Sequence, residues 1–146
     1  MMISIKNLYK SYIDNSTEQV VFQDLSYRFE SQGVYSVAGS SGSGKTTLLN
    51  LISGLDVYNK GTIVVDDKTI ESLSVEEKSI LRKDYFGFGY QFHYLLENLT
   101  VFENCLAACH GTENEYIYDI MKKLGIDHIK NKFPSNISGV KNKEHL

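Results

Sequence analysis

A glycine-rich octapeptide, GSSGSGKT, occupies residues 39–46 and constrains this chain more than any other feature. Its fixed positions fit the pattern G-x-x-x-x-G-K-[ST], in which a loop between a strand and a helix binds nucleotide phosphates. The context agrees, because an apolar run at 34–38 precedes the loop and apolar residues follow it at helical spacing from 45 to 55. A glycine- and serine-rich turn without a ligand is the alternative, and it does not require this order of elements. The sequence therefore predicts a phosphate-binding P-loop.

The residue types of the loop suit a polyphosphate. Glycines let the backbone curl so that successive N–H groups point inward at an anion, and the following helix aims its positive end at the same charge. Lys45 is expected to reach the β- and γ-phosphates, and the Thr46 hydroxyl to complete part of an Mg²⁺ shell. The motif alone does not choose among kinases, GTPases and transport ATPases. The residues predicted to hold the nucleotide phosphates are Gly39, Ser40, Ser41, Gly42, Ser43, Gly44, Lys45, Thr46 and Thr47.

Hydrophobic periodicity predicts an α/β fold. Strands are expected at 3–5, 20–29, 34–38, 62–65 and 86–90, and helices from 45 to a cap at Gly54 and at 74–82, 101–110, 114–124 and 127–132. Ser74 with Glu77 three residues later has the spacing of a capping box. We interpret the chain as one domain with a β-rich entry (1–38), a P-loop core (39–91), a helical subdomain (92–139) and an aberrant tail (140–146).

Composition and charge narrow the function. A formal net charge of −3 without a basic stripe gives no reason to expect nucleic acid as a partner. No apolar run approaches the roughly 20 residues that span a bilayer, and the N-terminus does not read as a signal peptide. Cys105 and Cys109 lack a second ligand pair for zinc and are too few for a disulfide framework, so free thiols are expected. These features predict a cytosolic protein that reaches a membrane only through a partner.

Several segments beyond the P-loop resemble the ATP-binding subunits of ABC transporters, from about residue 3 to residue 139. The stretch GSSGSGKTTLLNLISGLD (39–56) looks like their P-loop and following helix, and FGFGYQFHYLLENLTVFEN (86–104) is similar to their Q-loop region, with Gln91 in the place of the loop glutamine. Tyr12, within LYKSYIDNSTEQVVFQDLS, resembles the aromatic residue that stacks on adenine. The residues inserted after Tyr12 and the QFH run point to the lipoprotein-release and macrolide-efflux group.

The resemblance implies a P-loop NTPase core with an N-terminal antiparallel β subdomain and a helical insertion, binding ATP and Mg²⁺. Tyr12 would stack on adenine, and Gln91 would approach the Mg²⁺ beside Thr46. The Q-loop and the helical subdomain would contact a membrane-spanning permease at the cytoplasmic face, and the intact family works as a dimer that sandwiches two ATPs. His93 is interpreted as a surface or packing residue, because the hydrolytic histidine of the family lies much later in the chain.

The chain departs from the family at the signature motif, L-S-G-G-[QE]. The corresponding residues are Ile137-Ser138-Gly139-Val140-Lys141, in which Ser138 and Gly139 match and Val140 does not. The acidic strand end, the adjoining glutamate and the switch histidine that follow the signature in the family have no counterpart among the 146 residues. The resemblance therefore implies that the C-terminal part of the core is missing, predicts no catalytic residue in this chain, and leaves ATP binding as the most it does.

The last eight residues suggest a cause. Insertion of one G after the codon of Gly139 would, with suitable third bases, turn the reading into S-G-G-K-E-Q-R-A-S, which looks like the continuation of an ABC signature. We therefore expect a single-base frameshift, the alternative being a chain made short on purpose. The rival functions are a nucleotide-binding module that does not hydrolyse ATP, an inert frameshift fragment, and a P-loop kinase. The kinase is disfavoured because no arginine-rich lid follows the P-loop.

Overall fold

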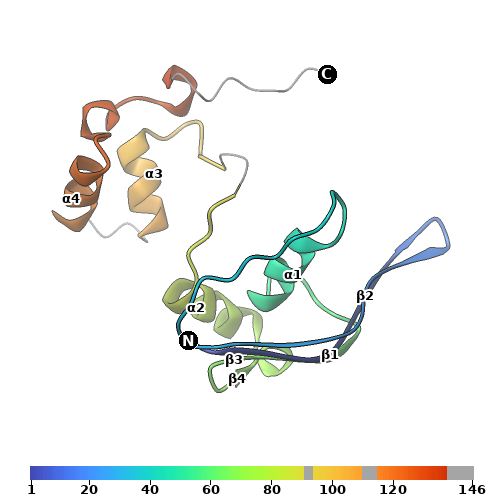
Figure 1. Cartoon of the computed structure of the whole chain (residues 1–146). Helices are drawn as coiled ribbons and strands as arrows, with labels where there is room; N and C mark the ends of the chain where they lie inside the picture. Colours follow the sequence, from blue (N-terminus) through green and yellow to red (C-terminus); the bar gives the residue numbers. More distant parts are fainter. Residues whose placement is uncertain (91–93, 110–114, 138–146) are drawn as a thin grey trace. The chain divides into compact units, whose positions relative to one another are not determined.

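Strands β1 (Ile3–Asp14) and β2 (Thr17–Phe29) form a long antiparallel hairpin in this computed structural model (Figure 1). The structure describes residues 1–90, 94–109 and 115–137. The hairpin turns through Asn15 and Ser16, whose φ angles of 46° and 70° suit a two-residue turn that follows the twist of the strands. The hairpin is longer than the sequence predicted, because β1 pairs with β2 as far as this turn.

A four-stranded sheet with the order β2-β1-β3-β4 forms around this hairpin, and each neighbouring pair is antiparallel. β3 is Lys60–Val65 and β4 is Lys68–Thr69. Helices α1 (Lys45–Ile52) and α2 (Val75–Tyr85) lie over one face of the sheet (Figure 1). The core between them consists of Ile5, Leu8, Leu48, Leu51, Ile52, Ile63, Val65, Ile70 and Leu81. The predicted antiparallel β subdomain and α/β fold are confirmed.

The end of α1 and the start of α2 follow the signals in the sequence, whereas α2 continues to Tyr85, past the predicted end at 82. α1 is followed by Gly54 at φ 67°, a left-handed conformation that glycine adopts without strain. The capping box of α2 is complete, because the Ser74 side chain accepts from the Glu77 N–H at 3.1 Å and the Glu77 carboxylate accepts from the Ser74 N–H at 2.8 Å. Local chemistry therefore determined where this helix begins.

Two predicted strands are wrong, because the sheet of the described residues includes neither 34–38 nor 86–90. The first segment is irregular, and the side chain of Val34 is fully exposed. In the second segment the chain leaves α2 with Phe86 in an extended conformation, and Phe88 is 43% exposed. A short apolar run has the same pattern in a buried strand and in an extended connection, so periodicity alone did not distinguish them.

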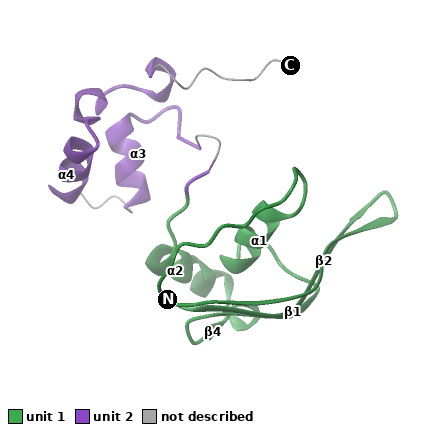
Figure 2. Ribbon diagram, in the orientation of Figure 1, with its two compact units in different colours: residues 1–88 green, residues 89–146 purple. Residues whose placement is uncertain are grey.

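Residues 1–88 and 89–146 form two compact units (Figure 2). The second unit contains α3 (Val101–Ala108), α4 (Glu115–Lys123) and two short 3-10 turns, Asp127–Ile129 and Pro134–Asn136. Stacking of Phe102 on Tyr118, with ring centroids 4.6 Å apart, joins the two helices. The predicted helices at 101–110 and 114–124 are confirmed within the described residues, whereas the one at 127–132 is only a short 3-10 turn.

Both cysteines lie in or next to α3. Cys105 and Cys109 are free and half-buried, as the sequence predicted. Burial, and to a smaller extent the neighbouring Cys109, raises the pKa of the Cys105 thiol. The thiol therefore stays protonated at neutral pH and is a weak nucleophile.

Candidate functional site

The P-loop lies where the irregular segment after β2 turns into α1. Gly44 is the N-terminal cap of α1 and has a φ of 90°, and a Cβ on it would come within 2.5 Å of Val21 Cγ1 on β2. Gly42 also has a positive φ, 78°, but a Cβ there would meet nothing within 4 Å. The end of the loop is thus packed closely on the hairpin, whereas its middle is open.

The ammonium group of Lys45 lies within the curve of the loop. Its Nζ donates to the carbonyl oxygens of Gly39 at 2.8 Å and Ser40 at 2.6 Å, and it lies 3.3 Å from Ser43 Oγ. The Ser43 N–H donates to the Ser40 carbonyl at 3.2 Å, which closes the turn. The loop therefore holds a positive charge against its own backbone in a half-buried position.

The first turn of α1 adds further positive potential. No acidic residue lies in this turn and no side chain caps it, so its first N–H groups have no partner within the helix. Thr46 is exposed in this turn, and Thr47 after it is half-buried. Thr46 therefore offers a hydroxyl oxygen, a hard ligand of the kind that Mg²⁺ prefers, beside the group that would hold a phosphate.

Tyr12 lies on the hairpin close to the part that supports the loop. Ser11, its neighbour on β1, pairs with Val20 of β2, and the next residue of β2, Val21, is the one that Gly44 approaches. The Tyr12 side chain is 42% exposed, and its hydroxyl donates to Asp56 Oδ2 at 2.7 Å. The structure thus brings Tyr12 and the P-loop to one region of the first unit.

The remaining predicted site residues lie outside the described residues. These are Gln91 with its neighbour His93, and the signature region from Ser138 to Lys141. Their roles remain predictions, as do those of Tyr12 and of the P-loop residues.

Sequence reasoning missed two residues around Tyr12. Lys10 is 5% exposed and lies with its ammonium 4.2 Å from the centre of the Tyr12 ring, and Asp56 binds both side chains. Residues two apart on a strand lie on the same face, but the sequence predicted no strand through Lys10 and Tyr12, which β1 contains. Nothing local points to Asp56, which follows α1 and lies 44 residues from Tyr12 in the chain.

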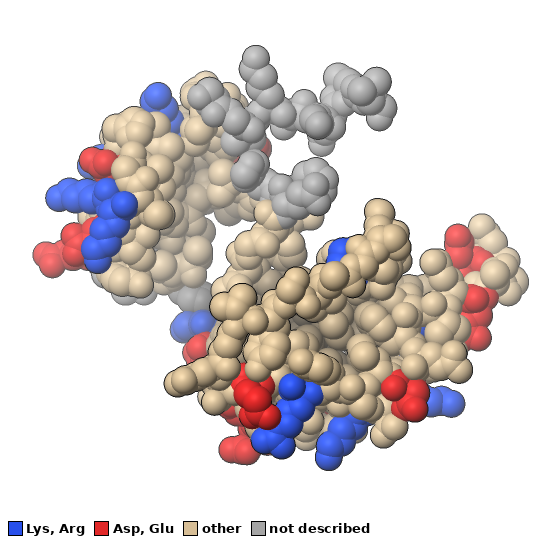
Figure 3. All heavy atoms as spheres, viewed as in Figure 1, with Lys and Arg blue, Asp and Glu red and all other residues tan. Residues whose placement is uncertain are grey.

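Away from the P-loop, the surface carries both basic and acidic side chains (Figure 3). On the face drawn in Figure 3, basic and acidic side chains are interspersed on both units, and the described atoms there form no broad basic patch. In the described part of the chain, no helix has both the length and the apolar character needed to cross a membrane.

Comparison with known proteins assigns the family. Residues 22–144 match the family described as ABC transporter, and this range covers most of the chain. This chain belongs to the ABC transporter family. The family predicted from the P-loop, the Q-loop region and Tyr12 is therefore confirmed.

Curated relatives of this ABC-family chain are ATP-binding proteins of several transporters. It is 35% identical to the bacitracin export ATP-binding protein BceA of Halalkalibacterium halodurans, over 94% of this chain and 57% of the relative. It is 31% identical to the lipoprotein-releasing system ATP-binding protein LolD of Francisella tularensis subsp. holarctica, over 95% of this chain and 63% of the relative. The chain thus spans about three fifths of the length of these two relatives. The two relatives are named for different cargoes, although this chain is similarly identical to both.

Solved structures show the same fold. The ATP-binding cassette MJ0796, solved as a dimer bound to ADP and Pi, matches the ABC-family chain with a TM-score of 0.82 and 25% identity. The match covers 94% of this chain and 63% of the cassette. The P-loop NTPase fold class is therefore confirmed for the part of the cassette that this chain spans.

The glycine at the start of α1 gives a stability prediction for this ABC-family chain. Gly44→Ala is expected to lower the free energy of unfolding by about 2–4 kcal/mol, because the left-handed backbone and the contact with Val21 each oppose a Cβ. Gly42→Ala is the matched control and should cost only about 1 kcal/mol, since its φ is also positive but its surroundings are open. Urea unfolding followed by circular dichroism measures both. Equal costs would contradict the close packing of the loop on β2.

Proposed function

We propose that this chain is the ATP-binding part of an ABC transporter subunit and that its P-loop binds the phosphates of ATP. The observation that carries the proposal is the arrangement at the start of α1. There the Lys45 ammonium lies inside a glycine loop, directly before uncapped helical N–H groups. An anion entering this loop would meet a fixed positive charge and the positive end of a helix dipole together.

The residues of the loop fit ATP and Mg²⁺. Lys45 would exchange contacts with the loop carbonyls for contacts with the β- and γ-phosphates, and the open position at Gly42 leaves room for oxygen atoms close to the backbone. Thr46 would supply one oxygen ligand to Mg²⁺, and Gln91 a second. The metal ion, when bound, neutralises charge on the phosphates. Tyr12 would stack on the adenine.

The partner we propose is a membrane-spanning permease at the cytoplasmic face of a membrane, contacted through the Q-loop region and the helical subdomain. Tyr94 and Leu96 follow Gln91 in the chain by three and five residues and are 75% and 52% exposed. Large apolar side chains that are exposed close together in the chain suit a contact with another protein. The dimeric state of the solved cassettes supports pairing of two ATP-binding subunits.

ATP hydrolysis distinguishes an active transport ATPase from a module that binds ATP without hydrolysing it. No segment of residues 1–146 reads as the acidic strand end or the switch histidine of the family, so the 146-residue chain is expected to bind ATP without turning it over. Calorimetry with ATP and Mg²⁺ should show one saturable site, and a phosphate-release assay should give no signal above that of a Lys45→Ala control. Turnover that depends on Lys45 would contradict a binding-only chain, and the absence of any ATP binding would contradict the proposed function itself.

A further inference from the structure

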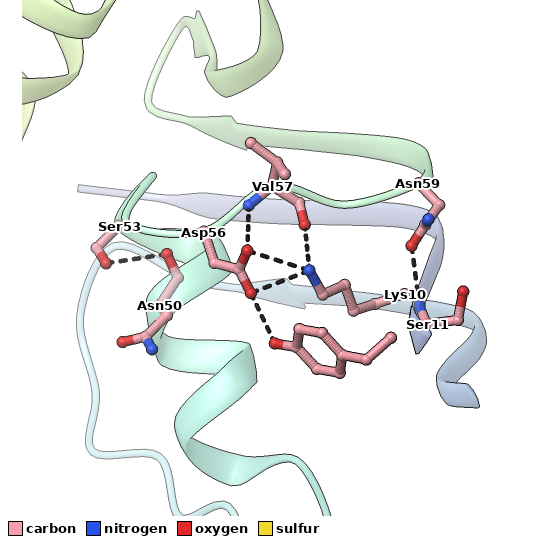
Figure 4. Close-up of polar contacts among 8 residues, drawn as sticks. Lys10, Ser11, Asn50, Ser53, Asp56, Val57 and Asn59 are labelled. Carbon is pink, nitrogen blue, oxygen red and sulfur yellow. Dashed lines mark hydrogen bonds and ion pairs between the residues drawn. The ribbon is translucent and has the colours of Figure 1, made fainter. Parts of the chain in front are cut away.

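The loop that follows α1 makes a compact polar cluster with β1 (Figure 4). Asp56 Oδ2 accepts from the Tyr12 hydroxyl at 2.7 Å and lies 3.0 Å from Lys10 Nζ. Its other oxygen, Oδ1, accepts from Lys10 Nζ at 3.1 Å and from the Val57 N–H at 2.7 Å. The Val57 carbonyl also accepts from Lys10 Nζ at 2.6 Å. One carboxylate therefore binds both the ring hydroxyl and the cation beside the ring.

The cluster is fixed to the strand on which Tyr12 lies. The Ser11 N–H donates to Asn59 Oδ1 at 2.8 Å, and the Asn59 N–H donates to the Tyr9 carbonyl at 3.0 Å. The same loop is tied to α1, because the Leu55 N–H donates to the Asn50 carbonyl at 2.8 Å. The position of Asp56 relative to Tyr12 is thus set by hydrogen bonds of this loop to β1 and to α1.

Lys10 covers one face of the Tyr12 ring. Its ammonium lies 4.2 Å from the ring centroid and is almost completely buried. A cation over an aromatic face is attracted by the ring quadrupole, more strongly where water is excluded. Tyr12 as a whole is 42% exposed, and the ring face turned away from this cation is the one that remains for a ligand.

We propose that Asp56 is a positioning residue for base binding: together with Lys10 it holds the Tyr12 ring with one face covered and the other open to a purine. This inference rests on the proposed function, in which Tyr12 stacks on adenine. A ring already fixed in its binding orientation loses less conformational freedom when a base stacks on it, and this improves affinity. In this role Asp56 would act through Tyr12 and would itself contact neither the phosphates nor the base.

The charge state of Asp56 supports this role. Partial burial raises its pKa, but hydrogen bonds from Tyr12, Lys10 and Val57 more than offset the effect, so that its pKa lies below the usual value. The carboxylate is therefore ionised at neutral pH and remains able to bind both partners. The cluster would persist across the pH range in which nucleotide binding is measured.

The test compares two ligands, ATP and inorganic tripolyphosphate, each with Mg²⁺. Tyr12→Phe keeps the ring and removes the hydroxyl that tethers it to Asp56. Asp56→Asn removes the negative charge that holds Lys10. Each variant is expected to bind ATP about 3- to 10-fold more weakly, a fraction of the roughly 5- to 150-fold that a whole base stack is worth. Tripolyphosphate, which has no base, should bind each variant as it binds the wild type.

The double variant separates a shared role from two independent ones. If Asp56 acts through Tyr12, the losses should not add, and Tyr12→Phe with Asp56→Asn should bind ATP about as well as the weaker single variant. Asp67→Asn, in the exposed turn between β3 and β4, is the matched control and should leave both affinities unchanged.

Three results would overturn the inference. Wild-type ATP affinity in Tyr12→Phe would show that the tether does nothing, and this variant keeps the Lys10–Asp56 pair even if Asp56→Asn fails to fold. Equal losses for ATP and tripolyphosphate would show an effect on the whole fold. Failure of the wild type to bind either ligand would overturn the proposed function, and this inference with it.

Discussion

Lys45→Ala is expected to weaken ATP binding by about 100-fold or more, since a charge-assisted contact in a partly desolvated loop exceeds an ordinary hydrogen bond. The wild-type ammonium already lies within the loop, 2.6 Å from the Ser40 carbonyl, so it is in place before a phosphate enters. Alanine removes the positive charge and leaves the loop carbonyls facing the phosphates. Repulsion between these oxygens adds to the lost attraction. Calorimetric titration of both chains with ATP and Mg²⁺ measures the effect.

Two controls show whether the loss is specific. Lys83→Ala removes an exposed lysine of α2 and should leave ATP affinity unchanged. Tyr12→Ala removes the proposed base contact and should cost about 30-fold, within the range known for base–aromatic stacking. Equal affinities in Lys45→Ala and Tyr12→Ala would contradict the roles assigned to the two residues.

Leu51→Ala is expected to lower the free energy of unfolding by about 2–5 kcal/mol, the cost of emptying a fully buried leucine site. Leu51 is 0% exposed and belongs to the core between α1 and the sheet, in one cluster with Ile63 and Leu8. These neighbours come from β1 and β3, so they cannot all close on the cavity without moving the sheet. Urea unfolding followed by circular dichroism gives the difference directly.

Leu49→Ala is the matched control for this core variant. Leu49 lies on the same helix but is 56% exposed, so its replacement should cost less than about 1 kcal/mol. A small effect of Leu51→Ala, or equal effects of the two variants, would contradict the packing of α1 on the sheet. Because α1 carries the P-loop at its first turn, the destabilised Leu51 variant should also bind ATP more weakly wherever it is partly unfolded.

Short sequence motifs correctly predicted those parts of the fold that depend on neighbouring residues. The P-loop followed from four fixed positions, and the start of α2 followed from the capping pair Ser74 and Glu77. The long hairpin was underestimated because β1 mixes polar and apolar residues, which pair with β2 only in the folded chain. The apolar run 34–38 was assigned to a strand that the described sheet does not contain.

The candidate site also contains residues that the sequence identifies and residues that only the folded chain brings together. Lys45 and Thr46 belong to a continuous motif and could be found from the sequence. The support of Tyr12 could not, because Asp56 lies in the loop after α1, 44 residues away in the chain, and no spacing rule connects the two. Contacts of this kind depend on how β1, α1 and the loop after α1 pack together, and packing follows from the whole core.

Amide NMR of the isotope-labelled chain, titrated with ATP and Mg²⁺, shows which backbone N–H groups meet the nucleotide. Because the P-loop and the first turn of α1 are proposed to bind the phosphates, we expect the largest shifts on the amides of residues 41–47. Tripolyphosphate should reproduce these shifts, and Lys45→Ala should abolish them. Shifts that fall elsewhere, or no shifts at saturating ATP, would show that the P-loop does not bind the phosphates.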